Sequence, residues 1–179
     1  MYAQGQKTRL RPLRRADLDK MMEWDDDEEI QAYIGKKGIA DSQSGVWFES
    51  VRRDRRRVVL AIETDTGEFI GDLELKQIDW RNKRAELCIC IGNKAYWGLG
   101  FGTDAIVGAL QLAWERFGIK EVYLRVYCSN VRAIRCYQKC GFQKIGVLPA
   151  DKRRSRGLHD LLLMSCQTDR LASRLQAAQ

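Results

Sequence analysis

A cluster of glycines near the middle of the chain has the composition of an anion-binding loop. It lies between an apolar, strand-like run and a long helical pattern, and consists of Trp97, Gly98, Leu99, Gly100, Phe101, Gly102 and Thr103. Glycines remove side chains, so backbone N–H groups at the start of a helix can converge on a phosphate. The loop therefore predicts a phosphate or pyrophosphate site, while a tight strand-to-helix turn is the alternative reading of the same residues.

Two common phosphate loops do not fit this segment. The P-loop requires Gly-Lys followed by Ser or Thr, and the chain contains no such tripeptide. The dinucleotide fingerprint places its third glycine three residues after the second, whereas Gly102 follows Gly100 by only two. The segment before the loop also has the pattern of antiparallel hairpin strands, and not the βαβ unit of a dinucleotide-binding domain.

A second pair of residues with useful chemistry follows about thirty residues later. Asn130 stands at the start of a helical segment that Gly141 ends, and Tyr137 lies seven residues after Asn130. Seven residues are two helical turns, so both side chains lie on the same helix face and can contact one ligand. Asparagine at this position is also a helix cap, and a lone tyrosine is often a core aromatic. Their neighbourhood with the glycine loop favours a shared ligand site.

The elements that must position these residues can be read from periodicity. Alternating or continuous apolar runs predict strands over 8–13, 58–63, 69–78, 85–91, 122–126, 142–148 and 158–166. Helical spacing predicts helices over 18–24 (with Asp17 as cap), 30–34, 43–53, 103–117 and 130–140. The helical crossover after residue 102 makes strand 122–126 parallel to strand 85–91.

The expected fold class is α+β, with one mixed, mostly antiparallel sheet flanked by helices. A chain of 179 residues suits a single domain, with its core over about 8–166 and a polar tail over 167–179. Apolar residues make up 45% and charged residues 31%. No apolar run is long enough to span a membrane and no secretory signal begins the chain, so we expect a cytoplasmic protein.

The six cysteines do not have the spacing of a metal site. No C-x-x-C pair occurs and His159 is the only histidine, so we expect no bound metal. Cys88 and Cys90 share a strand face, while Cys136 and Cys140 share a helix face. These patterns predict buried, reduced thiols.

The charge distribution has two readings at each cluster. The net charge is +7, and basic runs occupy 52–57 and 152–156, but no aromatic residues interleave with them, so we do not expect a nucleic-acid partner. A solvated basic surface is the simpler interpretation. The acidic run 25–29 could attract a cationic acceptor, or could simply favour the start of a helix, which is the interpretation we prefer.

The quoted motifs resemble one known family. The loop WGLGFGTDA, followed by N-x-x-A-I-x-x-Y-x-K-x-G-F over 130–142, is similar to the GCN5-related N-acetyltransferase (GNAT) superfamily, whose acyl-CoA N-acyltransferase fold also matches the order of elements. The nearest branch holds ribosomal-protein N-terminal acetyltransferases and spermidine acetyltransferases. The family loop is Q/R-x-x-G-x-G/A, and Trp97 departs from its first position. The departure matters little if backbone amides bind the phosphates.

The resemblance implies a site for acetyl-CoA or coenzyme A as cosubstrate. Backbone amides of residues 97–103 would hold the pyrophosphate. The strand residues Ile89, Cys90 and Ile91 would pair with the pantetheine arm, and Asn130 would hydrogen-bond to it. Tyr137 would lie near the sulfur.

The implied reaction is acetyl transfer to a primary amine, such as a protein N-terminus, a polyamine or another small amine. A neutral amine attacks the thioester carbonyl, and a backbone N–H on strand 85–91 can stabilise the oxyanion. Tyr137 is the candidate general acid for the departing thiolate. Glu86 is the leading candidate for the base, with Asp72 and Glu74 as alternatives. His159 and Asp160 could line the acceptor groove.

Two other classes of function remain open on the sequence alone. A non-catalytic CoA-binding sensor or subunit would retain the glycine loop. An RNA-associated protein would use the basic runs but would leave the glycine loop unexplained. In the resembling family, acceptor choice comes from the segments corresponding to 24–33 and 149–160, and by analogy a homodimer is possible.

Overall fold

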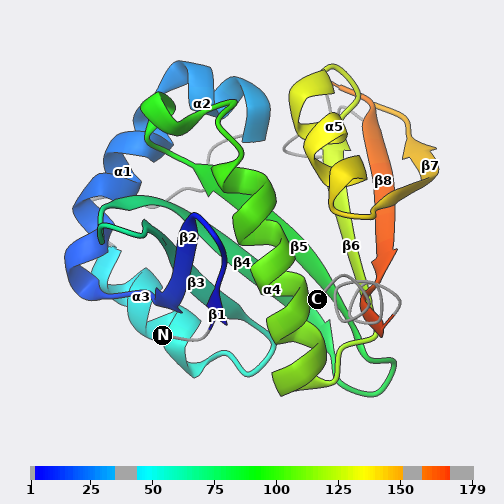
Figure 1. Cartoon of the computed structure of the whole chain (residues 1–179), viewed down its shortest axis with the longest axis horizontal. Coiled ribbons are helices and arrows are strands. Elements are labelled where there is room, and N and C mark those ends of the chain that lie inside the picture. Colours follow the sequence, from blue (N-terminus) through cyan, green and yellow to red (C-terminus); the bar gives the residue numbers. More distant parts are fainter. Residues whose placement is uncertain (1–2, 35–43, 151–158, 170–179) are drawn as a thin grey trace.

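The computed structural model describes residues 3–34, 44–150 and 159–169. Within these ranges the strands form one eight-stranded sheet of order β1-β2-β3-β4-β5-β6-β8-β7 (Figure 1). The strands are β1 (Ala3–Gln4), β2 (Thr8–Pro12), β3 (Val58–Thr64), β4 (Phe69–Asp79), β5 (Arg84–Ile91), β6 (Glu121–Tyr127), β7 (Gln143–Leu148) and β8 (Leu161–Gln167). The expected mixed, mostly antiparallel sheet is confirmed.

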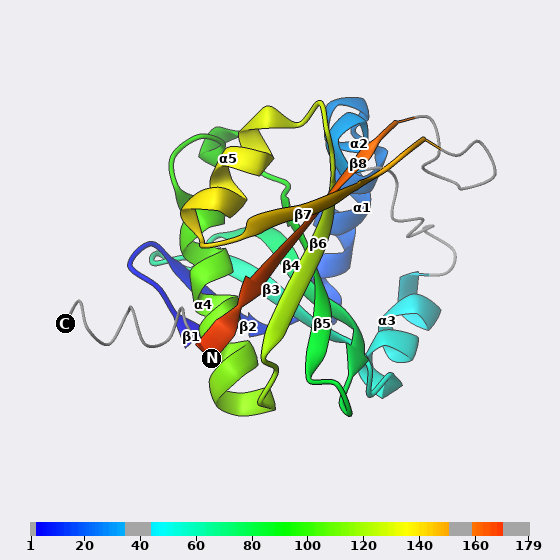
Figure 2. The ribbon, with the colours of Figure 1, turned by 90° about the vertical axis from the view of Figure 1, so that its right-hand side faces the viewer.

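Helices cover both faces of this sheet. They are α1 (Leu18–Asp26), α2 (Glu28–Ile34), α3 (Ser44–Arg53), α4 (Phe101–Phe117) and α5 (Val131–Lys139), with 3-10 turns η1 (Arg15–Asp17) and η3 (Lys94–Tyr96). Figure 2 shows α4 and α5 on one side of the sheet and α1 to α3 on the other. Every helix expected from periodicity is present, and only the short strand β1 was not expected.

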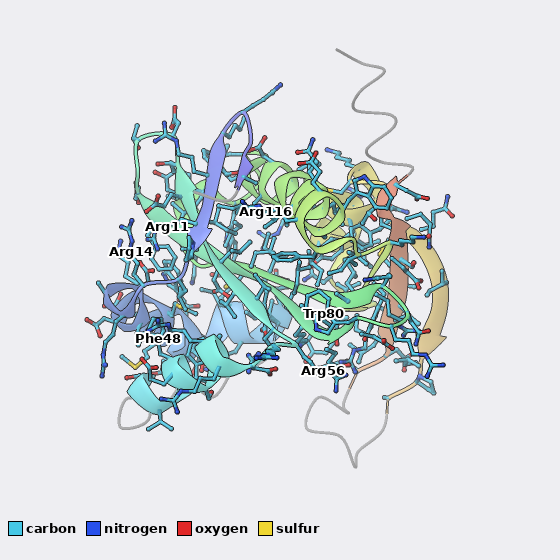
Figure 3. All side chains as sticks on the ribbon, turned by 90° about the horizontal axis from the view of Figure 1, so that it is seen from below. Arg11, Arg14, Phe48, Arg56, Trp80 and Arg116 are labelled. Carbon is cyan, nitrogen blue, oxygen red and sulfur yellow. The ribbon has the colours of Figure 1, made fainter. Side chains whose placement is uncertain are left out.

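Each face has its own apolar core. The larger core lies under α4, where Ile106 and Leu110 pack against strand residues such as Leu73 and Leu124. A smaller core lies under α1 and α3, where Phe48 packs with Leu18 and Met21 (Figure 3). Alternation along each strand sends successive side chains to opposite faces, so polar positions of β4 and β5 share the face of α1 to α3.

The central strands β5 and β6 separate soon after they meet. They pair in parallel only from Arg84 to Glu86 against Glu121 to Tyr123, and then diverge toward α5 (Figure 1). The expected parallel pairing is confirmed. The divergence leaves the second half of β5 without a strand neighbour on that side, so a ligand can enter the sheet there.

The glycine loop and α4 follow directly from that open half of β5. Gly100 is the N-cap of α4 with a left-handed φ of 89°, a conformation that glycine adopts without strain. The helix begins at Phe101, two residues earlier than periodicity suggested, and Gly118 ends it with φ of 60°. The start of α4 therefore faces the gap between β5 and β6.

Two expectations about side chains are corrected by the structure, one for Asp17 and one for the cysteines. The Asp17 side chain does not cap α1, because both of its carboxylate oxygens accept hydrogen bonds from Arg11 on β2, at 2.7 and 2.8 Å. Of the four cysteines expected to be buried, Cys90 and Cys140 are buried, whereas Cys88 and Cys136 are half-buried. All six cysteines are free.

Asp104 in the first turn of α4 fixes the position of the glycine loop against β2. Its carboxylate accepts hydrogen bonds from the backbone N–H groups of Gln6, Lys7 and Thr8 at 2.9–3.1 Å and from the Thr8 hydroxyl at 2.7 Å. We expect Asp104→Ala to lower the free energy of unfolding by about 2–4 kcal/mol, because these donors lose a charged acceptor. Urea unfolding measures this, with exposed Asp65→Ala as the matched control. Equal losses in the two variants would contradict the expectation.

Candidate active site

Two cavities meet at the gap between β5 and β6. The larger has a volume of about 680 Å³ and the smaller about 490 Å³. Five residues border both, namely Tyr33, Ile34, Ile89, Asn130 and Tyr137. A ligand in one cavity can therefore touch a ligand in the other at this waist.

The smaller cavity brings together most of the expected cofactor residues. It is lined by Ile89, Cys90, Ile91, Trp97, Gly98, Gly100, Gly102, Thr103, Asn130 and Tyr137. Leu99 and Phe101 do not line it. Leu99 is exposed, and Phe101 packs edge-on against Tyr96 with ring centroids 4.8 Å apart. Their contribution can come only from their backbone.

The backbone of the glycine loop is available for an anion. Within the described ranges, none of the N–H groups from Gly98 to Thr103 donates to another protein atom, and the first helical bond of α4 is Asp104 N to Gly100 O at 3.0 Å. Unsatisfied N–H groups at a helix start attract negative charge. An added Cβ on Gly102 would lie 3.7 Å from Ile91 and 3.9 Å from Cys136, which is ordinary contact. The space beside this residue is therefore open to a ligand.

Trp97 acts differently from the rest of the loop. Its backbone N–H donates to Lys94 O at 3.0 Å. Contrary to expectation, this amide is therefore not available to a phosphate. Its indole N–H instead donates to Ile91 O at 2.6 Å. The Arg132 guanidinium lies 4.0 Å from the centre of the Trp97 ring. Trp97 therefore joins β5, the loop and α5 through its side chain.

The same indole bond shows which way the end of β5 faces. The carbonyl of Ile91 points into the gap, away from β4. Alternate residues of a strand direct their backbone groups to the same side, so the N–H and C=O of Ile89 also face the gap. These groups form an open strand edge beside Tyr137, to which an extended amide-bearing arm can pair.

Three cations of α5 line the smaller cavity and were not singled out from the sequence. They are Arg132, Arg135 and Lys139. A spacing of three and then four residues places them on one helix face, which is a signal that the sequence did contain. Lys7 does not line the cavity, but its ammonium lies beside the glycine loop and donates to Leu99 O at 2.9 Å. The chemistry of the cavity is that of a phosphate-rich ligand.

Asn130 and Tyr137 occupy the waist as their spacing indicated. The Asn130 Oδ1 caps α5 by accepting from Ala133 N at 3.1 Å, as expected, which leaves its Nδ2 as a donor. The Tyr137 hydroxyl has no hydrogen-bond partner among the described residues, although its ring packs on Phe142. The pKa of Tyr137 is raised, first by burial and then by the neighbouring thiols, led by Cys88. The phenol therefore keeps its proton at physiological pH.

Glu86 is not placed where a base is needed. It is 2% exposed, does not line either cavity, and accepts hydrogen bonds from Arg125 at 3.0 and 2.9 Å. The pKa of Arg125 is raised, first by this hydrogen bond. Because its carboxylate is buried and ion-paired, the expected role of Glu86 as base is not supported by this geometry. Asp72 and Glu74, the alternatives, both line the larger cavity.

The acidic run before α2 does not face the larger cavity. Asp27 accepts from the N–H groups of Glu29 and Ile30 at the start of α2, and Lys94 bridges Asp27 and Glu29 at 2.8 Å each. Asp25 is buried. The run therefore favours a helix start and an ion-pair network, which is the simpler of its two interpretations. His159 packs on Tyr127 and Asp160 accepts from Ala150 N, and neither lines a cavity.

Cys136 in the smaller cavity offers a chemical probe of the site. Its pKa is lowered, first by a hydrogen bond from Cys140 and also by the Thr103 hydroxyl 3.2 Å away. A lowered pKa means that the reactive thiolate forms at lower pH than in an ordinary thiol, whose pKa is about 8.5. As the pH is raised, we expect iodoacetamide labelling of Cys136 to set in at a lower pH than labelling of an ordinary thiol. We also expect bound CoA to suppress this labelling. Peptide mass spectrometry measures both, with exposed Cys128 as the control that CoA leaves unprotected. If the extent of Cys136 labelling were the same with and without CoA, Cys136 would not lie in the CoA site.

The described ranges contain neither a metal-binding cluster nor a membrane-spanning helix. No three His, Cys, Asp or Glu side chains there are grouped to hold a metal ion. No helix of those ranges is long and apolar enough to cross a bilayer.

The fold and site define a class of protein, and comparison with known proteins agrees. A model of the Acetyltransferase (GNAT) domain matches residues 7–143. The chain therefore belongs to the GNAT family, and it is an acetyl-CoA-dependent N-acetyltransferase.

Individual relatives cover most of the chain. Spermidine N(1)-acetyltransferase of Escherichia coli K12 is 30% identical over 141 residues, which are 78% of this chain and 75% of that one. An N-alpha-acetyltransferase of Sulfurisphaera tokodaii is 25% identical over 153 residues, covering 80% and 85%. An uncharacterised protein of Methanocaldococcus jannaschii is longer, and the match spans 28% of its length.

A solved structure shares the fold. The crystal structure of spermidine N-acetyltransferase from Vibrio cholerae in complex with CoA and spermine superposes with a TM-score of 0.84 at 23% identity, covering 92% of this chain and 98% of that one.

Proposed function

We propose that this enzyme binds acetyl-CoA in the smaller cavity and an amine in the larger one, and joins them at Tyr137. The shared border of the two cavities is the observation that carries this proposal. The amides from Gly98 to Thr103 hold the diphosphate, and the α5 cations and Lys7 neutralise its charge. The Ile89 edge and the Asn130 Nδ2 bind the pantetheine amides.

Tyr137 is the general acid in this proposal. Among the described residues, none forms a hydrogen bond with its hydroxyl, and Tyr137 borders both cavities. Its raised pKa keeps the proton available for the leaving thiolate. A backbone N–H at the open end of β5, with Ile89 the foremost candidate, stabilises the oxyanion.

Glu74 is the group that we propose to accept the proton of the amine, directly or through water. It lines the larger cavity, lies opposite Cys88 in the sheet, and has a side chain that is 15% exposed. Arg57 donates to it at 2.6 Å, so its carboxylate is oriented. Glu74→Gln should raise the pH needed for half-maximal kcat/KM. An unchanged pH profile would exclude Glu74.

The acceptor is a primary amine, and the relatives suggest two sources for it. One relative carries the name of a spermidine acetyltransferase and another that of an N-alpha-acetyltransferase. The decisive experiment follows thiol release from acetyl-CoA with polyamines, small amines and short peptides, alongside calorimetry with CoA. Turnover with any amine supports the proposal. Tight CoA binding with no turnover would instead indicate a CoA-binding sensor.

We propose that the enzyme forms a homodimer through β7. This strand is the outer strand of the sheet in the described ranges, and its Ile145 and Val147 are 55% and 56% exposed. An unpaired edge with apolar side chains can pair with a second copy. Sedimentation velocity should find a dimer that the double variant Ile145→Lys, Val147→Lys converts to monomer, while exposed Val46→Lys leaves it intact. A monomeric wild type at micromolar concentration would exclude this interface.

We also propose a cytoplasmic location. Six free cysteines fit a reducing compartment. Recovery of the protein in a membrane or secreted fraction on cell fractionation would contradict this.

A further inference from the structure

The larger cavity is lined by four cations, Arg56, Arg57, Lys76 and Arg125, and by three carboxylates, Asp54, Asp72 and Glu74. The side chains of Arg125, Arg57 and Lys76 are 37%, 28% and 23% exposed. Two of the carboxylates are more covered, since Asp72 is 5% exposed and the side chain of Glu74 is 15% exposed, whereas Asp54, directly after α3, is exposed. Away from Asp54, a molecule in this cavity therefore meets cations that are more exposed than the carboxylates beside them.

The carboxylates are also already hydrogen-bonded, whereas some cationic donors are not. Glu74 accepts from Arg57 at 2.6 Å and Glu86 accepts two bonds from Arg125. Lys76 Nζ lies 3.9 Å from Glu86, which is beyond hydrogen-bond distance. In the described part of the chain, Arg125 uses Nε and Nη2 for Glu86 and leaves Nη1 without an acceptor. Lys76 and Arg125 can therefore each donate to a further anion.

These two donors lie close to the reacting end of the cavity. Lys76 pairs across the sheet with Glu86, next to the pair of Glu74 with Cys88. Lys76, Cys88 and Tyr137 all line the larger cavity. The pKa of Cys88 is raised by burial and lowered in part by Lys76, and Cys88 in turn contributes to the raised pKa of Tyr137. An anion on Lys76 would thus occupy the same cavity as the attacking amine.

The walls of the cavity add an apolar component. Trp47 of α3 and Tyr127 of β6 line it, together with Leu161 at the start of β8. Arg56 lines its edge beside α3 (Figure 3). A tri- or tetracation would place its remaining ammonium groups against Arg57, Lys76 and Arg125, which is unfavourable.

We propose that the acceptor is an amine that also carries a carboxylate, bound by Lys76 and Arg125 in the larger cavity. This inference rests on the proposed function of that cavity. Two sources supply the same chemistry, namely a free amino acid and a peptide N-terminus followed closely by an acidic side chain. Lys76 and Arg125 determine specificity in this scheme, and Tyr137 remains the catalytic acid.

Matched acceptor pairs test the proposal with the full-length enzyme. Thiol release from acetyl-CoA gives kcat/KM for L-phenylalanine against phenethylamine, for a peptide with Asp against one with Asn at its second position, and for spermidine. The carboxylate member of at least one pair should be used about tenfold better, as expected for one charge-assisted hydrogen bond. The pair that shows the preference identifies whether the acceptor is a free amino acid or a peptide.

Variants then connect the preference to the cavity. Lys76→Met should reduce the ratio within the responding pair by about tenfold, and Arg125→Lys, which retains a cation beside Glu86, should reduce it less. Lys120→Met, directly before β6 and outside both cavities, should leave the ratio unchanged. A change in ratio cannot come from general loss of folded enzyme, because both acceptors use the same preparation.

Three outcomes would overturn the inference. Equal use of the members of every pair would exclude carboxylate recognition while leaving the acetyltransferase function intact. Preference for spermidine over every carboxylate-bearing amine would also exclude carboxylate recognition and leave the acetyltransferase function intact. Absence of thiol release with the entire panel would reject both this inference and the proposed function.

Discussion

Replacing Tyr137 with phenylalanine is expected to lower kcat by about 10²–10³-fold, because the departing thiolate loses its proton donor. Binding of acetyl-CoA should change little, since the ring and its contact with Phe142 remain. The measurement is steady-state thiol release together with calorimetry of CoA binding. Tyr123→Phe is the matched control, because Tyr123 donates to Gln77 at 3.2 Å and lines neither cavity.

The pH dependence of the wild type follows from the same residue. A general acid must be protonated, and the pKa of Tyr137 is raised above the usual phenol value of about 10. We therefore expect kcat not to fall as the pH rises toward that usual value. A fall of kcat with a midpoint below about pH 9, or a Tyr137→Phe variant as active as Tyr123→Phe, would remove Tyr137 from the acid role.

Placing a carboxylate at position 102 is expected to weaken CoA binding by about 100-fold or more, because like charges meet at the diphosphate site. Gly102→Asp should nevertheless fold well. Position 102 lies in the first turn of α4, where an acidic side chain is favourable, and an added Cβ meets only ordinary contacts. Loss of affinity without loss of stability is therefore the expected signature.

Gly102→Ala is the control for this experiment. It adds the same Cβ without charge and improves helix propensity by up to about 1 kcal/mol. We expect its CoA affinity to stay within about tenfold of the wild type, since one methyl group excludes little of the ligand. Calorimetry with CoA and thermal unfolding give both quantities. If Gly102→Asp bound CoA as tightly as Gly102→Ala, the diphosphate would not lie at the start of α4.

The parts of the site that were predictable depend on local chain geometry. The glycine loop could be read as an anion site because left-handed glycines and a helix start have short-range sequence signals. Asn130 and Tyr137 could be placed on one face because helical periodicity fixes the direction of side chains seven residues apart. Arg132, Arg135 and Lys139 carried the same kind of signal and could have been found by it.

Glu86 shows where such reasoning fails. Its residue type and its strand made it a reasonable base, but the register of β4, β5 and β6 places Lys76 and Arg125 beside it. Ion pairing between strands that are far apart in sequence is decided by register, which single-strand patterns do not encode. Asp17 failed for the same reason, since its partner Arg11 comes from β2.

By itself the sequence determined an α+β domain with a glycine loop at a strand-to-helix junction and a tyrosine two turns after a helix cap. Only the tertiary structure decided that β5 and β6 separate, that the two resulting cavities meet at Tyr137, and that Lys76 and Arg125 line the larger one. Local patterns are set by backbone geometry over a few residues. Cavities and ion pairs instead depend on the register and divergence of strands, which arise only when the whole sheet is assembled.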